Sequence, residues 1–295
     1  MTAKNYPFIR IACPRKYEEM VIDLLIAKGF THFAYVQQQT YNVLAGTGEM
    51  SELECYMEDA VLLRQVVPAI KPLLARFNVR GDYTIQQKER KDWSEDFARN
   101  YPDIDFYEGI RVIPPWRRER TAKEQLIIDP GQAFGTGRHF TTRSCAFLIT
   151  QSQLLFDDFL FDLGCGSAIL SIFICKLGAS SVVAVDRDRE TMRNSRRNTE
   201  NNKAHQQILL LKADVTALPF LPERLHKTVM NMEYDVITAC LTAWSSSMNI
   251  GDWLILGGIL LRERAMMKQL LRAKGFGVLT ELTDGEWVSF RVQKK

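Results

Sequence analysis

Residues 159–170, FLFDLGCGSAIL, decide the fold of this chain. An apolar run typical of a buried strand ends at Leu163, and an apolar helical pattern begins at Ile169. Between them, Gly164 and Gly166 allow a sharp turn in which the backbone can adopt positive φ and approach a ligand closely. The segment therefore predicts a strand-turn-helix unit that places a ligand at the carboxyl end of a parallel strand.

Strands and helices alternate through the rest of the C-terminal part, which predicts a doubly wound, Rossmann-like sheet. Residues 277–292 add a β-hairpin, which would form an antiparallel end to that sheet. The further strands are expected at residues 181–185, 208–212, 234–239 and 254–261, and the helices at 169–177, 188–202 and 262–274.

Residues 1–90 predict a smaller α+β domain of the ferredoxin-like type, with the order β-α-β-β-α-β. Pro68 and Pro72 are expected to break its second helix. Residues 91–120 are polar and rich in proline and aromatic residues, so we expect a linker there, followed by the second domain at 121–295. The expected strands of the first domain are residues 8–13, 32–38, 41–45 and 82–87, and the expected helices 16–28 and 51–77.

Composition restricts the class of protein. The net charge of +3 over 295 residues is too balanced to indicate nucleic-acid binding by bulk charge. Six cysteines without a C-x-x-C pair favour reduced, buried thiols in a cytosolic protein. The N-terminus has no apolar signal region, and no apolar run is long enough to cross a bilayer. We expect a soluble, cytoplasmic monomer with no metal site.

Three acidic residues, Asp162, Asp186 and Asp214, stand at the ends of successive predicted strands. Asp186 follows Gly166 by 20 residues and can accept hydrogen bonds from ribose hydroxyls. A dinucleotide fingerprint would require a third glycine where this chain has Ile169. The anion at Asp162 would also repel a pyrophosphate, whereas it suits a cationic sulfonium and an amino group. The pattern therefore favours S-adenosylmethionine over a dinucleotide as cofactor.

Residues 129–142 read DPGQAFGTGRHFTT. Together with DLGCGSAIL and VVAVDRD, this segment resembles the ribosomal protein L-eleven methyltransferase family, the PrmA-type enzymes. The resemblance covers most of the chain, including Asp92-Trp93, Pro114-Pro115-Trp116 and residues 285–288. It implies an N-terminal ferredoxin-like domain for substrate recognition and a C-terminal methyltransferase domain. It also implies methyl transfer to lysine or N-terminal amines of a large-subunit ribosomal protein.

The resemblance further implies a set of cofactor-binding residues, in which the AFGTG loop of residues 133–137 covers the cofactor and opens and closes. His139 is the only histidine near this loop, so it is a substrate-proximal candidate together with Cys240. A lone loop histidine is more often structural than catalytic. Together with the residues derived from the strand ends and the glycine turn, the expected cofactor residues are Phe134, Gly135, Thr136, Gly137, Thr142, Asp162, Gly164, Cys165, Gly166, Asp186, Asp214 and Cys240.

The chain departs from the family pattern at four positions. Arg138 and Phe140 replace a threonine and a proline, and Ala168 replaces a glycine. Cys240 stands where the family usually has asparagine, just after the strand predicted at residues 234–239. A thiol makes weaker hydrogen bonds than a carboxamide. Three hypotheses follow: methylation of a ribosomal protein, methylation of another protein or a small molecule, and cofactor binding without turnover.

Two clusters of arginine mark the sequence, one in the predicted helix after Asp186 and one before the second domain. A solvated helix face with intrahelical ion pairs is the simpler interpretation. Contact with ribosomal RNA or an acidic partner is the alternative. The clusters are Arg187, Arg189, Arg193, Arg196 and Arg197, and Arg117, Arg118 and Arg120.

Overall fold

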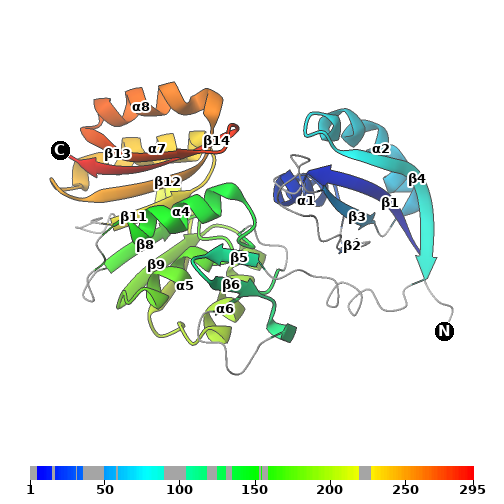
Figure 1. Ribbon diagram of the computed structural model, residues 1–295, viewed down its shortest axis with the longest axis horizontal. Helices are drawn as coiled ribbons and strands as arrows, with labels where there is room; N and C mark the ends of the chain where they lie inside the picture. Colours follow the sequence, from blue (N-terminus) through cyan, green and yellow to red (C-terminus); the bar gives the residue numbers. More distant parts are fainter. Residues whose placement is uncertain are drawn as a thin grey trace. The chain divides into compact units, whose positions relative to one another are not determined.

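The computed structural model divides the chain into two compact units, residues 1–103 and 104–295 (Figure 1). The structure describes residues 5–14, 17–30, 32–35, 50–57, 59–89, 104–117, 125–130, 135–152, 154, 159–218 and 227–295.

The first unit contains one four-stranded antiparallel sheet with the strand order β2-β3-β1-β4. Two helices supply Val21, Leu25, Leu63 and Ile70 to the apolar core beneath this sheet. The predicted ferredoxin-like arrangement is confirmed. The elements are β1 (Asn5–Pro14), α1 (Glu18–Ala27), β2 (His32–Tyr35), β3 (Met50–Tyr56), α2 (Ala60–Ala75) and β4 (Arg80–Glu89).

The first unit differs from prediction at its second half. The start of the predicted helix 51–77 is strand β3, in which Leu53 and Cys55 face the core at the period of two that a strand requires. Helix α2 begins only after Asp59, whose carboxylate caps it, and continues through Pro68 and Pro72. Both prolines are exposed, so water can satisfy the carbonyls that lose their partners. The strand predicted at 41–45 lies outside the described residues.

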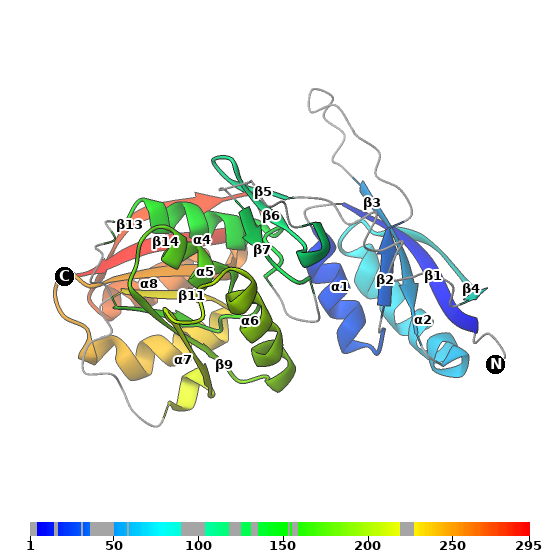
Figure 2. The ribbon, with the colours of Figure 1, turned by 90° about the horizontal axis from the view of Figure 1, so that it is seen from below.

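The second unit is built on a seven-stranded sheet with the order β10-β9-β8-β11-β12-β14-β13 (Figures 1 and 2). All its strands are parallel except β14, which runs antiparallel to both of its neighbours. The predicted doubly wound sheet with a terminal antiparallel hairpin is confirmed. The strands are β8 (Phe159–Leu163), β9 (Ser181–Asp186), β10 (Ile208–Lys212), β11 (Lys227–Asn231), β12 (Trp253–Leu260), β13 (Phe276–Thr283) and β14 (Trp287–Lys294).

Helices cover both faces of this sheet and divide its core into two layers. Helices α4 and α5 bury Leu148 and Phe173 on one face, and α7 and α8 bury Ile237 and Leu271 on the other. The helices are α4 (Phe140–Thr150), α5 (Ile169–Lys176), α6 (Arg189–Asn201), α7 (Tyr234–Trp244) and α8 (Arg264–Ala273), with short 3₁₀ turns η3 (Val215–Ala217), η4 (Ser245–Ser247) and η5 (Leu261–Glu263).

Part of the expected linker is folded into the second unit. Strands β5 (Ile104–Tyr107), β6 (Ile110–Ile113) and β7 (Gln125–Ile127) form a small sheet, with η2 (Pro115–Arg117) after β6. Phe106 packs edge-on against Phe173 of α5, with ring centroids 5.5 Å apart. Apolar burial therefore assigns residues 104–117 to the core of the second unit. Residues 90–103 and 118–124 lie outside the described residues.

Residues 234–239 form the start of helix α7, so the strand predicted there is wrong. The run Val236-Ile237-Thr238 is β-branched and favours a strand locally. The buried residues of this element, however, include Ile237, Leu241 and Trp244, which recur at helical spacing. The parallel strand of this region is β11, which begins seven residues earlier.

Two smaller features complete the fold. All six cysteines are buried thiols. Within the described residues, no helix combines the length and the hydropathy that a membrane span requires.

Candidate functional site

The glycine turn lies at the carboxyl end of β8 and leads into α5. Gly164 and Gly166 have φ of 72° and 52°, in the left-handed region that the sequence predicted. The backbone N–H groups of Gly164 and Cys165 donate to the carbonyl of Val185 at 2.8 and 3.0 Å, which ties the turn to β9. A Cβ at Gly164 would lie 2.3 Å from Sδ of Met232, so this face of the turn accepts no side chain.

Strand order places this turn at a topological switch point. The connections from β8 lead outward to β9 and β10 on one side, whereas β11 pairs with the other side of β8. Ligands of open α/β sheets bind at the carboxyl ends of strands where the order reverses in this way. The residues that follow β8, β9 and β11 therefore surround the candidate site.

Asp186 ends β9 and is bonded to the glycine turn. Its Oδ2 accepts from the backbone N–H of Gly166 at 3.1 Å, and its Oδ1 accepts from that of Asp188 at 3.0 Å. Each carboxylate oxygen has a second lone pair, so the side chain keeps acceptor capacity for a ligand hydroxyl. The side chain is thereby oriented beside the turn, as a ribose-binding acid must be.

Asp214 follows β10, the next strand outward, and is exposed. Its Oδ1 accepts from the backbone N–H and the hydroxyl of Thr216 at 2.9 and 2.7 Å. These hydrogen bonds lower the pKa of the Asp214 carboxyl from its ordinary value. Asp214 is therefore ionised at neutral pH and held at the same edge of the sheet as Asp186.

Asp162 lies within β8 and is only 2% exposed. Burial raises the pKa of this carboxyl to about 6, although the hydroxyl and backbone N–H of Ser171 donate to its Oδ2 at 2.5 and 3.1 Å. A buried carboxylate without a cationic partner is costly, and a ligand carrying positive charge would lower that cost. The buried position of Asp162 thus agrees with the argument from the sequence that this carboxylate suits a positively charged ligand.

The end of the AFGTG loop rests on the glycine turn. Ser167 donates its hydroxyl to the carbonyl of Gly135 at 2.5 Å. Gly135 and Gly137 both have positive φ, and a Cβ at Gly137 would lie 3.0 Å from Ile169. Thr136 between them is half-buried. Phe134, a predicted cofactor residue, lies outside the described residues.

His139 and Thr142 begin helix α4. His139 caps the helix, because its Nδ1 accepts from the backbone N–H of Thr141 at 3.3 Å, and its ring lies edge-on against Trp287. Nδ1 is therefore occupied, which favours a structural role for this histidine. Thr142 is 1% exposed, and Arg138 and Phe140, two departures from the family pattern, are half-buried beside it in sequence.

Asn231, which the sequence argument missed, ends β11 on the other side of the switch point. Its Nδ2 lies 3.4 Å from the hydroxyl oxygen of Thr142, and its Oδ1 is a buried acceptor without a hydrogen-bond partner among the described residues. A Cβ at Gly257 would lie 2.7 Å from this Oδ1, so glycine is required opposite it. The glycine pair 257–258 was the sequence signal that could have revealed Asn231.

Cys240 is not at this position. It lies in helix α7, is fully buried in the apolar layer beneath the sheet, and has its Sγ 3.7 Å from the carbonyl oxygen of Val215. Burial raises the pKa of the Cys240 thiol to about 12. The strand of this region is β11, and it ends at an asparagine, Asn231. Cys240 therefore does not occupy the position after a strand on which its predicted departure from the family rested. Cys165 is also a buried thiol, and burial raises its pKa well above the ordinary value.

The family model described as "Ribosomal protein L11 methyltransferase (PrmA)" matches residues 5–295. The chain belongs to this family. A relative named ribosomal protein L11 methyltransferase from Synechococcus sp. (strain RCC307) is 32% identical over 69% of this chain and 69% of its own length. One of the same name from Exiguobacterium sp. (strain ATCC BAA-1283 / AT1b) is 27% identical over 83% of both chains.

A solved structure supports the same assignment. The ribosomal protein L11 methylase of Lactobacillus delbrueckii subsp. bulgaricus is 25% identical, with a TM-score of 0.58. The match covers 66% of this chain and all of that one. The methyltransferase fold of the family is thus shared by this chain.

Proposed function

We propose that this chain transfers methyl groups from S-adenosylmethionine to amines of ribosomal protein L11, at lysine side chains or the N-terminus. The observation that carries the proposal is the switch point between β8 and β11. Acids lie on one side of it, and on the other lies Oδ1 of Asn231, which has no hydrogen-bond partner among the described residues. Membership of the family supplies the substrate, and the compartment proposed is the cytoplasm, where that substrate is made. The first unit would recognise the substrate.

The residues at the switch point fit this cofactor. Asp186 would accept hydrogen bonds from its ribose, and Asp214 from its adenine amino group. The backbone of Gly164 would lie against its amino-acid part, and Asp162 would supply the negative charge that a sulfonium and an ammonium favour. When bound, the cofactor supplies an electrophilic methyl group.

Asn231 would orient the substrate. A lysine amine has a pKa of about 10.4 in water and must lose a proton before it can act as a nucleophile. Desolvation lowers that pKa, because burial disfavours the charged ammonium. The carbonyl oxygen of Asn231 can accept an N–H of the neutral amine and direct its lone pair toward the methyl group, so that positioning supplies much of the catalysis.

The test is label transfer from methyl-labelled S-adenosylmethionine to purified L11, followed by identification of the modified residue. Label on a lysine or α-amine is the expected result. Asp186→Asn should abolish it, whereas Asp188→Asn should not, because Asp188 is exposed and caps α6 by accepting from Thr191 N–H at 2.7 Å. Label on a different protein of a cell extract would favour another substrate, and cofactor binding without any product would favour a binding protein.

We also propose that the exposed face of α6 contacts ribosomal RNA. Residues 187–203 contain six arginine or lysine residues and three acidic residues, so this segment alone carries the +3 net charge of the whole chain. Arg193 pairs with Glu190, whereas exposed Arg189 and Arg196 form no ion pair within the described part of the chain. Arginine binds phosphate oxygens through two parallel N–H groups.

Binding of a ribosomal RNA fragment at 50 and 200 mM salt tests this contact, because phosphate contacts make affinity strongly salt-dependent. Arg196→Glu should weaken binding about tenfold at 50 mM salt. Arg272→Glu makes the same change of charge at an exposed position at the end of α8 and should leave binding within about twofold. Equal losses in both variants would show bulk attraction and exclude a specific role for α6.

A further inference from the structure

The face of α6 that points into the second unit carries an unusual set of side chains, three asparagines spaced by four residues. Asn194 is 3% exposed, Asn198 is fully buried, and Asn202 follows directly after the helix and is half-buried. This spacing aligns the three side chains along one face. A buried carboxamide is destabilising unless its hydrogen bonds are made, so the partners of these side chains indicate their role.

One set of partners is the chain segment that leads from β7 into the AFGTG loop. Asn202 makes two bonds to the backbone of Ile127, accepting its N–H at 2.9 Å and donating to its carbonyl at 2.7 Å. Asn198 accepts the N–H of Asp129 at 2.8 Å, and Asn194 donates to the carbonyl of Asp129 at 3.2 Å. The three side chains thus pair with this segment as a neighbouring strand would.

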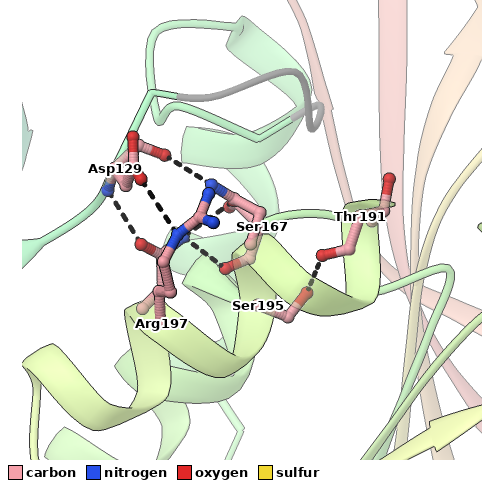
Figure 3. A network of polar contacts seen from close by, with 7 residues as sticks. Asp129, Ser167, Thr191, Ser195 and Arg197 are labelled. Atoms are coloured by element: carbon pink, nitrogen blue, oxygen red, sulfur yellow. Dashed lines mark hydrogen bonds and ion pairs between the residues drawn. The ribbon is translucent and has the colours of Figure 1, made fainter. Parts of the chain in front are cut away.

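The other set of partners is the glycine turn. Asn198 donates to the carbonyl of Ser167 at 3.0 Å, and Ser195 donates to the carbonyl of Gly166 at 2.5 Å. Figure 3 shows Asp129, Ser167 and Ser195 gathered along α6, with the guanidinium of Arg197 directed at Asp129. The Arg197 Nε lies 3.3 Å from Oδ2 of Asp129. Helix α6 therefore joins the loop segment to the turn.

Asn198 is the residue at which these two sets meet. A carboxamide has one acceptor oxygen and two N–H donors. Here the oxygen accepts from the backbone N–H of Asp129. Nδ2 donates to the carbonyl of Ser167 and, at 3.0 Å, to the side-chain oxygen of Asn194. Ser167 in turn holds Gly135 at the far end of the loop. Both ends of the segment 129–135 are thus tied to the glycine turn, one through Asn198 and one through Ser167.

We propose that Asn198 is a positioning residue that fixes Asp129 against the glycine turn and thereby sets the affinity for the cofactor. The binding step of this inference rests on the proposed function. With Asp129 and Gly135 both bonded to neighbouring groups before the ligand arrives, less conformational entropy is lost on binding. Loss of the Asn198 amide would release one anchor, and loss of the Ser167 hydroxyl would release the other.

The experiment uses the full chain and two measurements on each variant. Hydrogen exchange of the peptide spanning residues 127–138 is followed in the cofactor-free protein, and the Kd for S-adenosylmethionine is measured by calorimetry. Asn198→Ala should speed exchange of this peptide and raise the Kd about tenfold or more. Thr199→Val is the matched control, because Thr199 is buried next to Asn198 and its hydroxyl donates to a carbonyl of its own helix, that of Arg196, at 2.9 Å. It should change both quantities less than twofold.

Ser167→Ala keeps the proposal testable even where Asn198→Ala does not fold. It should raise the Kd in the same direction, and a double variant should lose less than the sum of the single losses, because both side chains act on one loop. A folded Asn198→Ala or Ser167→Ala protein with wild-type Kd and exchange would overturn the inference alone. A wild-type protein that binds no S-adenosylmethionine would overturn the proposed function and the inference together.

Discussion

The side-chain nitrogen of Asn231 lies 3.4 Å from the hydroxyl oxygen of Thr142, which joins the end of β11 to the first turn of α4. The oxygen of this carboxamide is buried beside Gly257 and has no hydrogen-bond partner in the part of the chain that the structure describes. An asparagine therefore stands at the end of the strand that precedes α7. The expected weakness at Cys240 has no structural basis, because that thiol packs in the apolar layer of α7.

Replacing Asn231 should impair chemistry more than binding of the cofactor. Asn231→Ala removes the acceptor proposed for the substrate amine, and we expect kcat to fall on the order of 100-fold, as for the loss of one positioned hydrogen-bonding group in an active site. Steady-state kinetics with L11 and with S-adenosylmethionine measures this loss. Thr142→Val, which removes only the hydroxyl that orients Asn231, should have a smaller effect. A folded Asn231→Ala enzyme with kcat within threefold of wild type would contradict the assignment.

Changes at Cys240 should alter stability and leave activity intact. Cys240→Ala removes a buried sulfur and should lower the free energy of unfolding by about 1–2 kcal/mol without changing kcat. Cys240→Asn should be more destabilising, because it places a carboxamide among apolar side chains. Urea denaturation and label transfer on the same preparations measure both properties. A gain of activity in Cys240→Asn would restore the view that the cysteine replaces a catalytic asparagine.

Asp162 should make stability depend on pH in a defined direction. Its folded pKa of about 6 lies above the ordinary value of 3.8, so the native state binds more protons than the unfolded chain between about pH 4 and pH 6. The contribution of Asp162 to the free energy of unfolding therefore decreases as pH rises from about 4 to 6 and is constant above that range. Relative to wild type, the free energy of unfolding of Asp162→Asn should increase by up to ~3 kcal/mol between pH 4 and pH 7, since one pKa unit corresponds to about 1.4 kcal/mol.

Cofactor binding should have the opposite dependence on pH. A cationic ligand favours the ionised form of Asp162, so the Kd for S-adenosylmethionine should decrease as pH rises from 5 to 7 and level off above the folded pKa of about 6. Calorimetry across this range measures the trend. In Asp162→Asn the Kd should be higher and nearly independent of pH. A wild-type Kd that is flat from pH 5 to 7 would rule out a charge contact with Asp162.

Ala168 should tolerate glycine unusually well. It is fully buried and has φ of 64°, a left-handed conformation that disfavours a Cβ. Ala168→Gly loses about one buried methyl group, worth ~0.8 kcal/mol, and relieves backbone strain of similar size. The free energy of unfolding should change by less than about 1 kcal/mol. Ala146→Gly, at a buried position inside α4, loses both the methyl group and helix propensity and should cost about 2 kcal/mol. Equal losses would show that Ala168 is unstrained.

The sequence predicted correctly those features that depend on residues close together in the chain. The glycine turn and the acids at the carboxyl ends of β9 and β10 follow from backbone preferences and sequence neighbours that act locally. Alternation of strands and helices then fixed the doubly wound sheet, because parallel strands need helical crossovers.

Other elements were decided by tertiary burial. Residues 234–239 have local β preference yet form a helix, because their apolar side chains reach the core only at a spacing of three to four. Residues 104–117 lie in the stretch expected to be a linker, but Phe106 and Val112 are buried in the core of the second unit together with residues of α5. Because the strand was predicted at residues 234–239 instead of 227–231, the position where the family usually has asparagine was assigned to Cys240 instead of Asn231.

The sequence by itself determined the class of sheet, the glycine turn and the three acids of this protein. Only the tertiary structure decided that Asn231 contacts Thr142 at the end of β11, that Cys240 belongs to the core, and that Asn198 joins Asp129 to the glycine turn. The physical reason is distance along the chain. Backbone preferences act between neighbours, whereas these contacts join residues 25 to 89 positions apart and exist only once the sheet has brought its strand ends together.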